Sequence, residues 1–367
     1  MADRAQAVLA RAEIGKLIAA LANRGFEVIG PVVRDGAIAL DHVEHLEDLP
    51  VGWTAVQGAG RYRLERRSDE ALFGYAVGPH SWKAFLFPPT VRLWSAERSN
   101  GGFRIVDEAK PATPRYAFLG VRACDLAAIA VQDRVLIGGH YVDPVYASRR
   151  DGVFVVAVHC GHSAETCFCA SMQTGPAARG GFDLALTELG HEFLVDVGSD
   201  AGAAVLADLS PQPVTDAVRE RARVALEASA AQQTRRMNTN GLKELLNGAF
   251  EHPHWKRVSE RCLACANCTM VCPTCFCSAV QDVSDVTGDH AERWRVWDSC
   301  FTLDHTYIHG GSVRASGEAR YRQWLTHKFA GWVDQFGTSG CVGCGRCIAW
   351  CPAGIDIVQE VEGLREG

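Results

Sequence analysis

Two stretches of the chain each carry four cysteines at the same spacing, C-x2-C-x2-C-x3-C-P. The cysteines are Cys262, Cys265, Cys268 and Cys272 in the first run, and Cys341, Cys344, Cys347 and Cys351 in the second. Three thiolates that are separated by two residues each can surround one face of an iron–sulfur cubane, and proline after the fourth cysteine stops the chain from folding back. The spacing therefore predicts two [4Fe–4S] sites.

Bacterial-type ferredoxins use this run, and in them the fourth cysteine of each run binds the other cluster. We therefore expect one cluster at Cys262, Cys265, Cys268 and Cys351, and a second at Cys341, Cys344, Cys347 and Cys272. Zinc is the alternative, because C-x2-C also binds zinc. Zinc sites take two separated pairs of ligands rather than two quartets that end in Cys-Pro, so iron–sulfur clusters are favoured.

Four further cysteines follow two expected strands. Apolar runs at 117–121 and 153–158 flank a helical pattern at 126–136, which Asp125 can cap. Parallel strands joined by a helix bring their carboxyl ends to one rim of a sheet, where ligands bind. The cysteines near this rim are Cys124, Cys160, Cys167 and Cys169. Spacing alone leaves open a third cluster, a zinc site that includes His162, and inert buried thiols.

Several other residues near the cysteine runs have less definite roles. We expect Cys275 and Cys277 to be structural or to lie beside ligands, and Cys300 to be a buried thiol, with no ligand role for any of them. Small residues at 264, 266, 343 and 345 let backbone amides approach sulfur. Arg346 either raises the potential of its cluster or is solvated. His252, His254, His305 and His309 are interpreted as surface or core residues.

The composition limits the function classes. A net charge of −6 and a pI near 6.1 argue against nucleic-acid binding. No window approaches eighteen uninterrupted apolar residues, so no membrane span is expected. The chain has 15 cysteines and its first residues lack the apolar stretch of a secretory leader. We therefore expect metal ligation rather than disulfides, and a cytoplasmic location.

The elements that must position these residues suggest an α+β or α/β fold class. We expect a mixed α/β domain over 1–213, with a helix in 2–23, strands or hairpins at 26–33, 37–40, 62–65 and 83–87, and a hairpin over 182–197. A helical linker over 214–255 follows. The last part, 256–367, is expected to be a helical, bacterial-type 2[4Fe–4S] ferredoxin-like domain with a long insertion at 278–340.

Several motifs together resemble a known family. They are Arg122-Ala-Cys124-Asp125-Leu, Cys167-Phe-Cys169-Ala-Ser-Met172, Gly175-Pro176, Asp183-Leu-Ala-Leu-Thr187, Cys272-Pro-Thr-Cys275-Phe-Cys277 and Trp297-Asp-Ser-Cys300. From about residue 80 onward the chain resembles the beta subunit of cytosolic, NADP-linked group 3 [NiFe] hydrogenases (sulfhydrogenases) and the related A subunit of anaerobic sulfite reductase. The resemblance implies a subunit that relays electrons between a flavin/NAD(P)H-binding subunit and the hydrogenase small and large subunits. It also favours the third cluster.

Two nucleotide-binding motifs are missing. No G-x-G-x-x-G opens a helix and no G-x4-G-K-[ST] occurs, so no flavin or nicotinamide site and no catalytic residue are predicted on this chain. We expect a non-catalytic electron-transfer subunit of a hydrogenase. The alternatives are a subunit of a sulfite reductase-type complex, a self-contained reductase with flavin at the Cys124/Cys160 rim, and a metal-stabilised adaptor.

Overall fold

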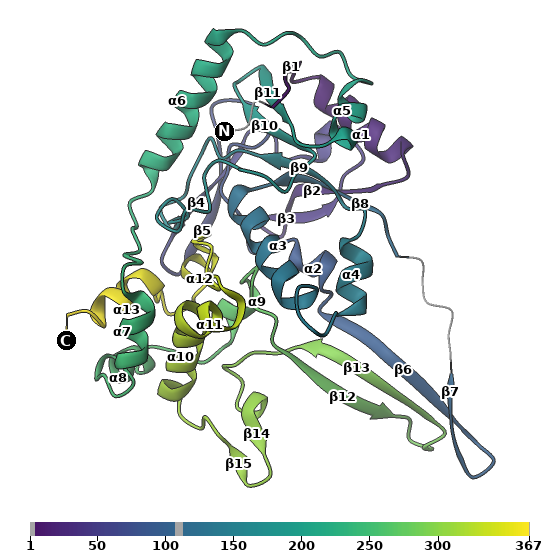
Figure 1. Ribbon diagram of the computed structural model, residues 1–367, viewed down its shortest axis with the longest axis vertical. Coiled ribbons are helices and arrows are strands. Elements are labelled where there is room, and N and C mark those ends of the chain that lie inside the picture. Colours follow the sequence, from purple (N-terminus) through teal and green to yellow (C-terminus); the bar gives the residue numbers. More distant parts are fainter. Residues whose placement is uncertain (1–3, 107–112, 367) are drawn as a thin grey trace.

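The computed structural model describes residues 4–106 and 113–366. A seven-stranded sheet lies at the centre of the N-terminal half, in the order β1-β11-β10-β9-β8-β2-β3 (Figure 1). Its strands are β1 (Gln6–Ala10), β2 (Glu27–Arg34), β3 (Ala37–His42), β8 (Tyr116–Val121), β9 (Phe154–Val158), β10 (Leu184–Glu188) and β11 (Glu192–Val197). The four inner strands pair in parallel and the outer strands pair antiparallel. The predicted parallel pair and the predicted hairpin are therefore confirmed.

Helices cover both faces of this sheet. Side chains alternate along each strand, so Val156 and Val158 pack into one core while Val155 and Ala157 pack into another. The first core includes α1 (Glu13–Asn23) and α5 (Asp200–Leu206). The second includes α2 (Lys83–Leu86), α3 (Ala123–Leu136) and α4 (Pro144–Arg150). The result is a three-layer arrangement whose strands are buried on both faces.

Three local expectations were wrong. Val8 and Leu9 were assigned to a helix, but they lie in β1 because that segment pairs with β11. Residues 83–87 were expected to be extended, but most of them form the short helix α2. A short apolar run is ambiguous between helix and strand, and its neighbours in space decide. Asp125 lies in the first turn of α3, and the N-cap position belongs to Arg122.

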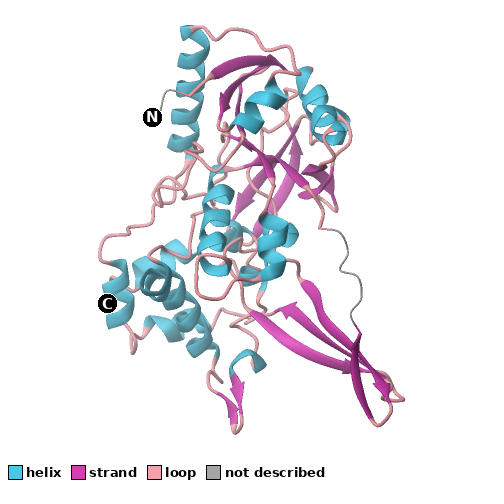
Figure 2. Ribbon diagram, turned by 45° about the vertical axis from the view of Figure 1, so that its right-hand side comes forward, coloured by secondary structure: helices cyan, strands magenta, loops and turns pink. Residues whose placement is uncertain are grey.

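A second sheet projects from the body of the molecule (Figure 2). It has the order β12-β13-β6-β7, with β6 (Thr90–Ser99), β7 (Gly102–Val106), β12 (Ser278–Ser284) and β13 (His290–Trp297). The expected insertion thus supplies two strands to a sheet whose other two strands come from the N-terminal half. Two small hairpins add β4 (Trp53–Gly58), β5 (Arg61–Arg66), β14 (Tyr307–Ile308) and β15 (Gly311–Ser312). The proposed domain boundaries themselves stay predictions.

The C-terminal half is mainly helical, which confirms the predicted fold class together with the α/β half. Helix α6 (Asp216–Gln232) leads to it from the central sheet (Figure 1). The other helices of this half are α7 (Leu242–Gly248), α8 (His254–Ser259), α9 (Asn267–Met270), α10 (Gly317–Thr326), α11 (Trp332–Phe336), α12 (Arg346–Ala349) and α13 (Ile357–Gly363). It also contains the short 3-10 helix η2 (Asp304–Thr306) and the π-helix η3 (His327–Gly331), while the 3-10 helix η1 (Leu46–Asp48) lies in the N-terminal half. Among the described residues, no helix has both the length and the apolar character needed to cross a membrane.

Candidate metal centres

The two cysteine runs fold into loops of the same shape. Ala264 and Ala266 in the first loop have φ of 50° and 65°, and Gly343 and Gly345 in the second have 65° and 77°. A left-handed alanine costs roughly 1–2 kcal/mol, so the first loop is held against a local preference. The amide of Ala264 lies 3.4 Å from the Cys262 sulfur, and that of Gly343 lies 3.4 Å from the Cys341 sulfur. The amides of Ala264 and Gly343 therefore approach sulfur as predicted, whereas no such contact is seen for the amides at 266 and 345 among the described residues.

The first loop surrounds an open cavity of about 460 Å³. The cysteines that line it include Cys262, Cys265 and Cys268 from the first run and Cys351 from the second. The amide of Ile355 donates to the Cys351 sulfur at 3.4 Å. Tyr321 and Trp324 form part of the apolar wall. The four cysteines expected at one cluster therefore face a common cavity.

The second loop lines a neighbouring cavity of about 330 Å³. Its cysteines are Cys341, Cys344 and Cys347 from the second run and Cys272 from the first. Burial raises the pKa of Cys341 to about 12, so a metal would have to displace its proton on binding. Cys347 and Trp324 line both cavities, so the two sites are adjacent.

Two buried lysines lie beside the second site. Lys328 comes from η3, and its Nζ lies 3.3 Å from the Cys272 sulfur and 3.7 Å from the Cys275 sulfur. Burial alone would lower the pKa of Lys328, but the charges of Cys272 and Cys275 outweigh it and raise that pKa. Lys83 donates to the carbonyl of Cys275 at 3.0 Å. Sequence reasoning missed both lysines because neither is near a cysteine run in the chain.

The third set of cysteines gathers at the carboxyl ends of β8 and β9, as expected. Cys124 lies in the first turn of α3, and Cys160 lies just after β9. Cys167 and Cys169 lie in the same connection between β9 and β10. Burial raises the pKa of each of these thiols, that of Cys167 to about 12, and their charges act on one another. Gln233 donates to the Cys169 sulfur at 3.2 Å.

Arg122 supplies a positive charge to this third set. One of its nitrogens, Nη2, donates to the carbonyls of Phe73 at 2.8 Å and Tyr75 at 3.1 Å. Burial raises the pKa of the Cys160 thiol, while the charge of Arg122 and a hydrogen bond from its side chain lower that pKa in part. A buried positive charge beside thiols fits an anionic, thiolate-ligated group at this position.

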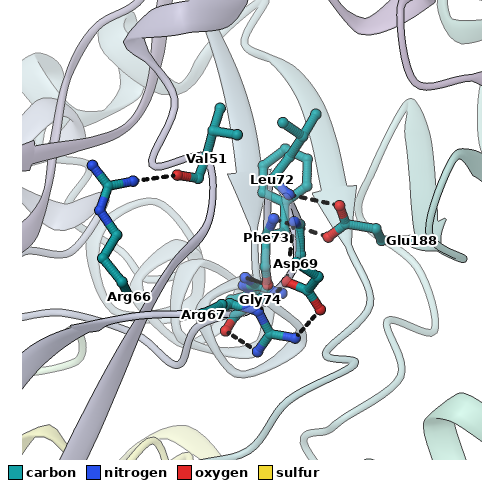
Figure 3. Close-up of polar contacts among 10 residues, drawn as sticks. Val51, Arg66, Arg67, Asp69, Leu72, Phe73, Gly74 and Glu188 are labelled. Carbon is teal, nitrogen blue, oxygen red and sulfur yellow. Dashed lines mark hydrogen bonds and ion pairs between the residues drawn. The ribbon is translucent and has the colours of Figure 1, made fainter.

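The segment that contains Phe73 and Tyr75, the acceptors of Arg122, is itself fixed by charged side chains (Figure 3). The carboxylate of Glu188 accepts from the amides of Leu72 at 2.6 Å and Phe73 at 2.9 Å. Arg67 donates to the carbonyl of Gly74 at 3.1 Å and to both oxygens of Asp69. Glu188 and Arg67 therefore fix the segment whose carbonyls accept the hydrogen bonds of Arg122.

The second and third sites are in contact. Cys344 packs with Cys124 and Cys169 in one buried group. The amide of Phe168 donates to the carbonyl of Gly343 at 2.9 Å. A Cβ on Gly343 would lie 2.7 Å from the amide nitrogen of Cys169, so only glycine permits this approach. In space, the second set of cysteines is therefore adjacent to both the first set and the third set.

The last three cysteines lie outside these sets. Cys275 contacts Cys272, while Cys277 and Cys300 contact each other and are both half-buried.

Within residues 4–106 and 113–366, no three His, Cys, Asp or Glu side chains are grouped so that they could hold a single metal ion.

Comparison with known proteins places the two ferredoxin-type runs in a known family domain. Residues 261–355 match the family model described as a 4Fe-4S dicluster domain. The chain is 37% identical over 258 residues to the sulfhydrogenase 2 subunit beta of Pyrococcus furiosus, which covers 69% of this chain and 75% of that protein. No solved structure matches.

Proposed function

The chain belongs to the sulfhydrogenase beta-subunit family, and from this membership we propose that it is the electron-transfer subunit of a [NiFe] hydrogenase complex. Its proposed partners are a flavin/NAD(P)H-binding subunit and the hydrogenase small and large subunits. We propose a cytoplasmic location, because thiols stay reduced there.

The observation that carries this proposal is the exchange of the fourth cysteine between the two loops. Cys351 lines the cavity of the first run, and Cys272 lines the cavity of the second. This is the arrangement expected of two [4Fe–4S] clusters, with the ligand sets Cys262, Cys265, Cys268, Cys351 and Cys341, Cys344, Cys347, Cys272.

A third cluster is proposed at Cys124, Cys160, Cys167 and Cys169. The support is the burial of these thiols together and the buried positive charge of Arg122 beside them. When bound, such clusters accept and donate single electrons. Because the second site is adjacent to both the first and the third, electrons could pass between all three.

The protein residues tune these sites rather than react. Backbone amides at 264, 343 and 355 donate to sulfur, and Lys328 and Arg122 offset the negative charge of a thiolate-ligated group. Both effects stabilise the reduced state and raise the potential. The aromatic and apolar side chains that line the first cavity lower the local polarity, which also affects the potential.

Iron analysis of anaerobically purified protein tests the number of sites. Three clusters require about twelve iron atoms per chain and two require about eight. Cys344→Ala should remove one cluster and should abolish NAD(P)H-linked turnover of the complex. Each partner's activity with artificial dyes should remain.

Cys300→Ala is the matched control, because Cys300 lies outside the three sets and should keep the full iron content. If Cys344→Ala retained NAD(P)H-linked turnover, the relay would be wrong. Colourless protein that carried zinc and no acid-labile sulfide would overturn the iron–sulfur assignment as well.

A further inference from the structure

Cys277 and Cys300 are brought together at the base of the projecting sheet. Cys277 directly precedes β12, and its carbonyl accepts from the amide of Asp298 at 2.9 Å, which continues the ladder beyond the pair Ser278–Trp297. The sulfur of Cys277 interacts with both the thiol and the backbone amide of Cys300. Two half-buried thiols thus face each other outside the proposed cluster sites.

A histidine and a carboxylate complete this group. The Nδ1 of His305 lies 2.8 Å from Oδ2 of Asp298, and the His305 side chain also hydrogen-bonds to the Cys277 sulfur. Asp298 is fixed in turn, because its Oδ1 accepts from the amide of Ser299 and the hydroxyl of Thr302, each at 2.7 Å. The side chain of His305 is 23% exposed, and Cys277 and Cys300 are each partly exposed.

We propose that Cys277 and Cys300 form a redox-active dithiol that reduces small organic disulfides, with His305 and Asp298 orienting and protonating the sulfur groups. This activity goes beyond the proposed relay and does not depend on the partner subunits. The arrangement of a thiol, an imidazole and a carboxylate is the one that activates cysteine nucleophiles.

The charges around Cys277 agree with this role. Contact with Cys300 and His305 lowers the pKa of Cys277 to about 4, and contact with Cys277 and Asp298 raises the pKa of His305 to about 9. The other titratable groups whose charges interact with Cys277 are Cys275, Lys83 and His327. At neutral pH the sulfur of Cys277 is therefore a thiolate beside an imidazolium.

The reaction balances without another cofactor. The Cys277 thiolate attacks one sulfur of a disulfide RSSR, forming a mixed disulfide and expelling RS⁻, which takes a proton from His305. His305 then accepts the proton of Cys300, and the Cys300 thiolate attacks the Cys277 sulfur and expels the second RS⁻, which leaves with that proton. Two thiols RSH are released, and the protein dithiol is oxidised to the Cys277–Cys300 disulfide. An external dithiol restores it.

The experiment uses the full chain with its clusters and bis(2-hydroxyethyl) disulfide as the probe. Peptide mass mapping of the wild-type protein should show a Cys277–Cys300 disulfide that dithiothreitol reverses. Cys300→Ser should instead trap a mixed disulfide on Cys277, and Cys277→Ser should give neither product. All three proteins should contain the same iron.

Wild-type protein without the internal disulfide, or an adduct on Cys300 in place of Cys277, would overturn the proposal. Loss of about four iron atoms in either variant would also overturn it, because these cysteines would then be cluster ligands.

The pH dependence of iodoacetamide labelling tests His305 separately. Labelling of Cys277 should be nearly constant from pH 5 to 8 in the wild type, and in His305→Gln it should rise with pH within that range, because one of the contacts that stabilise the thiolate is gone. A wild-type rate that itself rose tenfold per unit would contradict the thiolate.

Discussion

Arg346 donates two hydrogen bonds to the carboxylate of Asp125, at 2.8 and 3.2 Å, and both side chains are almost completely buried. The pair joins the second cysteine loop to the first turn of α3, next to Cys124. A third bond from Arg346 to the carbonyl of Gly78, at 3.0 Å, fixes the guanidinium further. The alternative of a solvated Arg346 is therefore wrong, and the residue holds two proposed cluster sites together.

Removing one partner of this pair should destabilise the protein strongly. Arg346→Ala leaves the Asp125 carboxylate buried without its partner, which costs about 3–5 kcal/mol. The matched control is Arg293→Ala, because the pair of Arg293 with Asp282 is exposed and screened by solvent, so its loss should have a much smaller effect. Urea unfolding of both variants under anaerobic conditions measures the difference. Equal losses would contradict the structural role of the buried pair.

Lys328 should raise the potential of the second site. Lys328→Met removes a buried positive charge 3.3 Å from the Cys272 sulfur, so the oxidised state becomes relatively more stable. We expect the midpoint potential to become more negative by at least about 59 mV, which corresponds to a tenfold change for a one-electron couple. Redox titration followed by electron paramagnetic resonance measures the shift. Lys328→Arg keeps the charge and should stay near wild type, and an unchanged Lys328→Met potential would exclude this role.

The close approach between the second and third sites predicts that Gly343 cannot be replaced. Gly343→Ala combines a left-handed φ with a Cβ 2.7 Å from the Cys169 amide, so we expect a loss of roughly 1–3 kcal/mol or more. Gly248→Ala is the control, because a Cβ there meets no atom within 4 Å. That control should stay within about 0.5 kcal/mol of wild type. Thermal unfolding of the two variants side by side tests the comparison.

The Cys277–His305 pair should give stability a defined pH window. The lowered pKa of Cys277, about 4, contributes stability that is complete above its unfolded value of about 8.5 and is lost as the pH falls toward 4. The raised pKa of His305, about 9, contributes stability that is complete below about 6.5 and is lost as the pH rises toward 9. The stability difference between wild type and His305→Gln should therefore be largest and flat between about pH 6.5 and 8.5. A difference that grew steadily toward pH 4 or pH 10 would contradict the ion pair.

The sequence by itself determined which chemistry the chain performs and which residues belong to each ferredoxin-type loop. Ligand spacing is a local property of the chain, because two-residue gaps between cysteines fit one cubane wherever the loop lies. The parallel strands at 117–121 and 153–158 were predictable for a similar reason, since a buried strand is apolar on both faces.

Only the tertiary structure decided what surrounds the sulfur atoms. Lys328 beside Cys272, Arg122 beside Cys160 and the group of Cys277 with His305 all depend on where distant segments pack, and no pattern in the chain records such distances. The same is true of the strand identity of Val8 and Leu9, which an edge pairing with β11 decides. Charges and hydrogen bonds act through space, so the tuning of each site follows from packing rather than from spacing along the sequence.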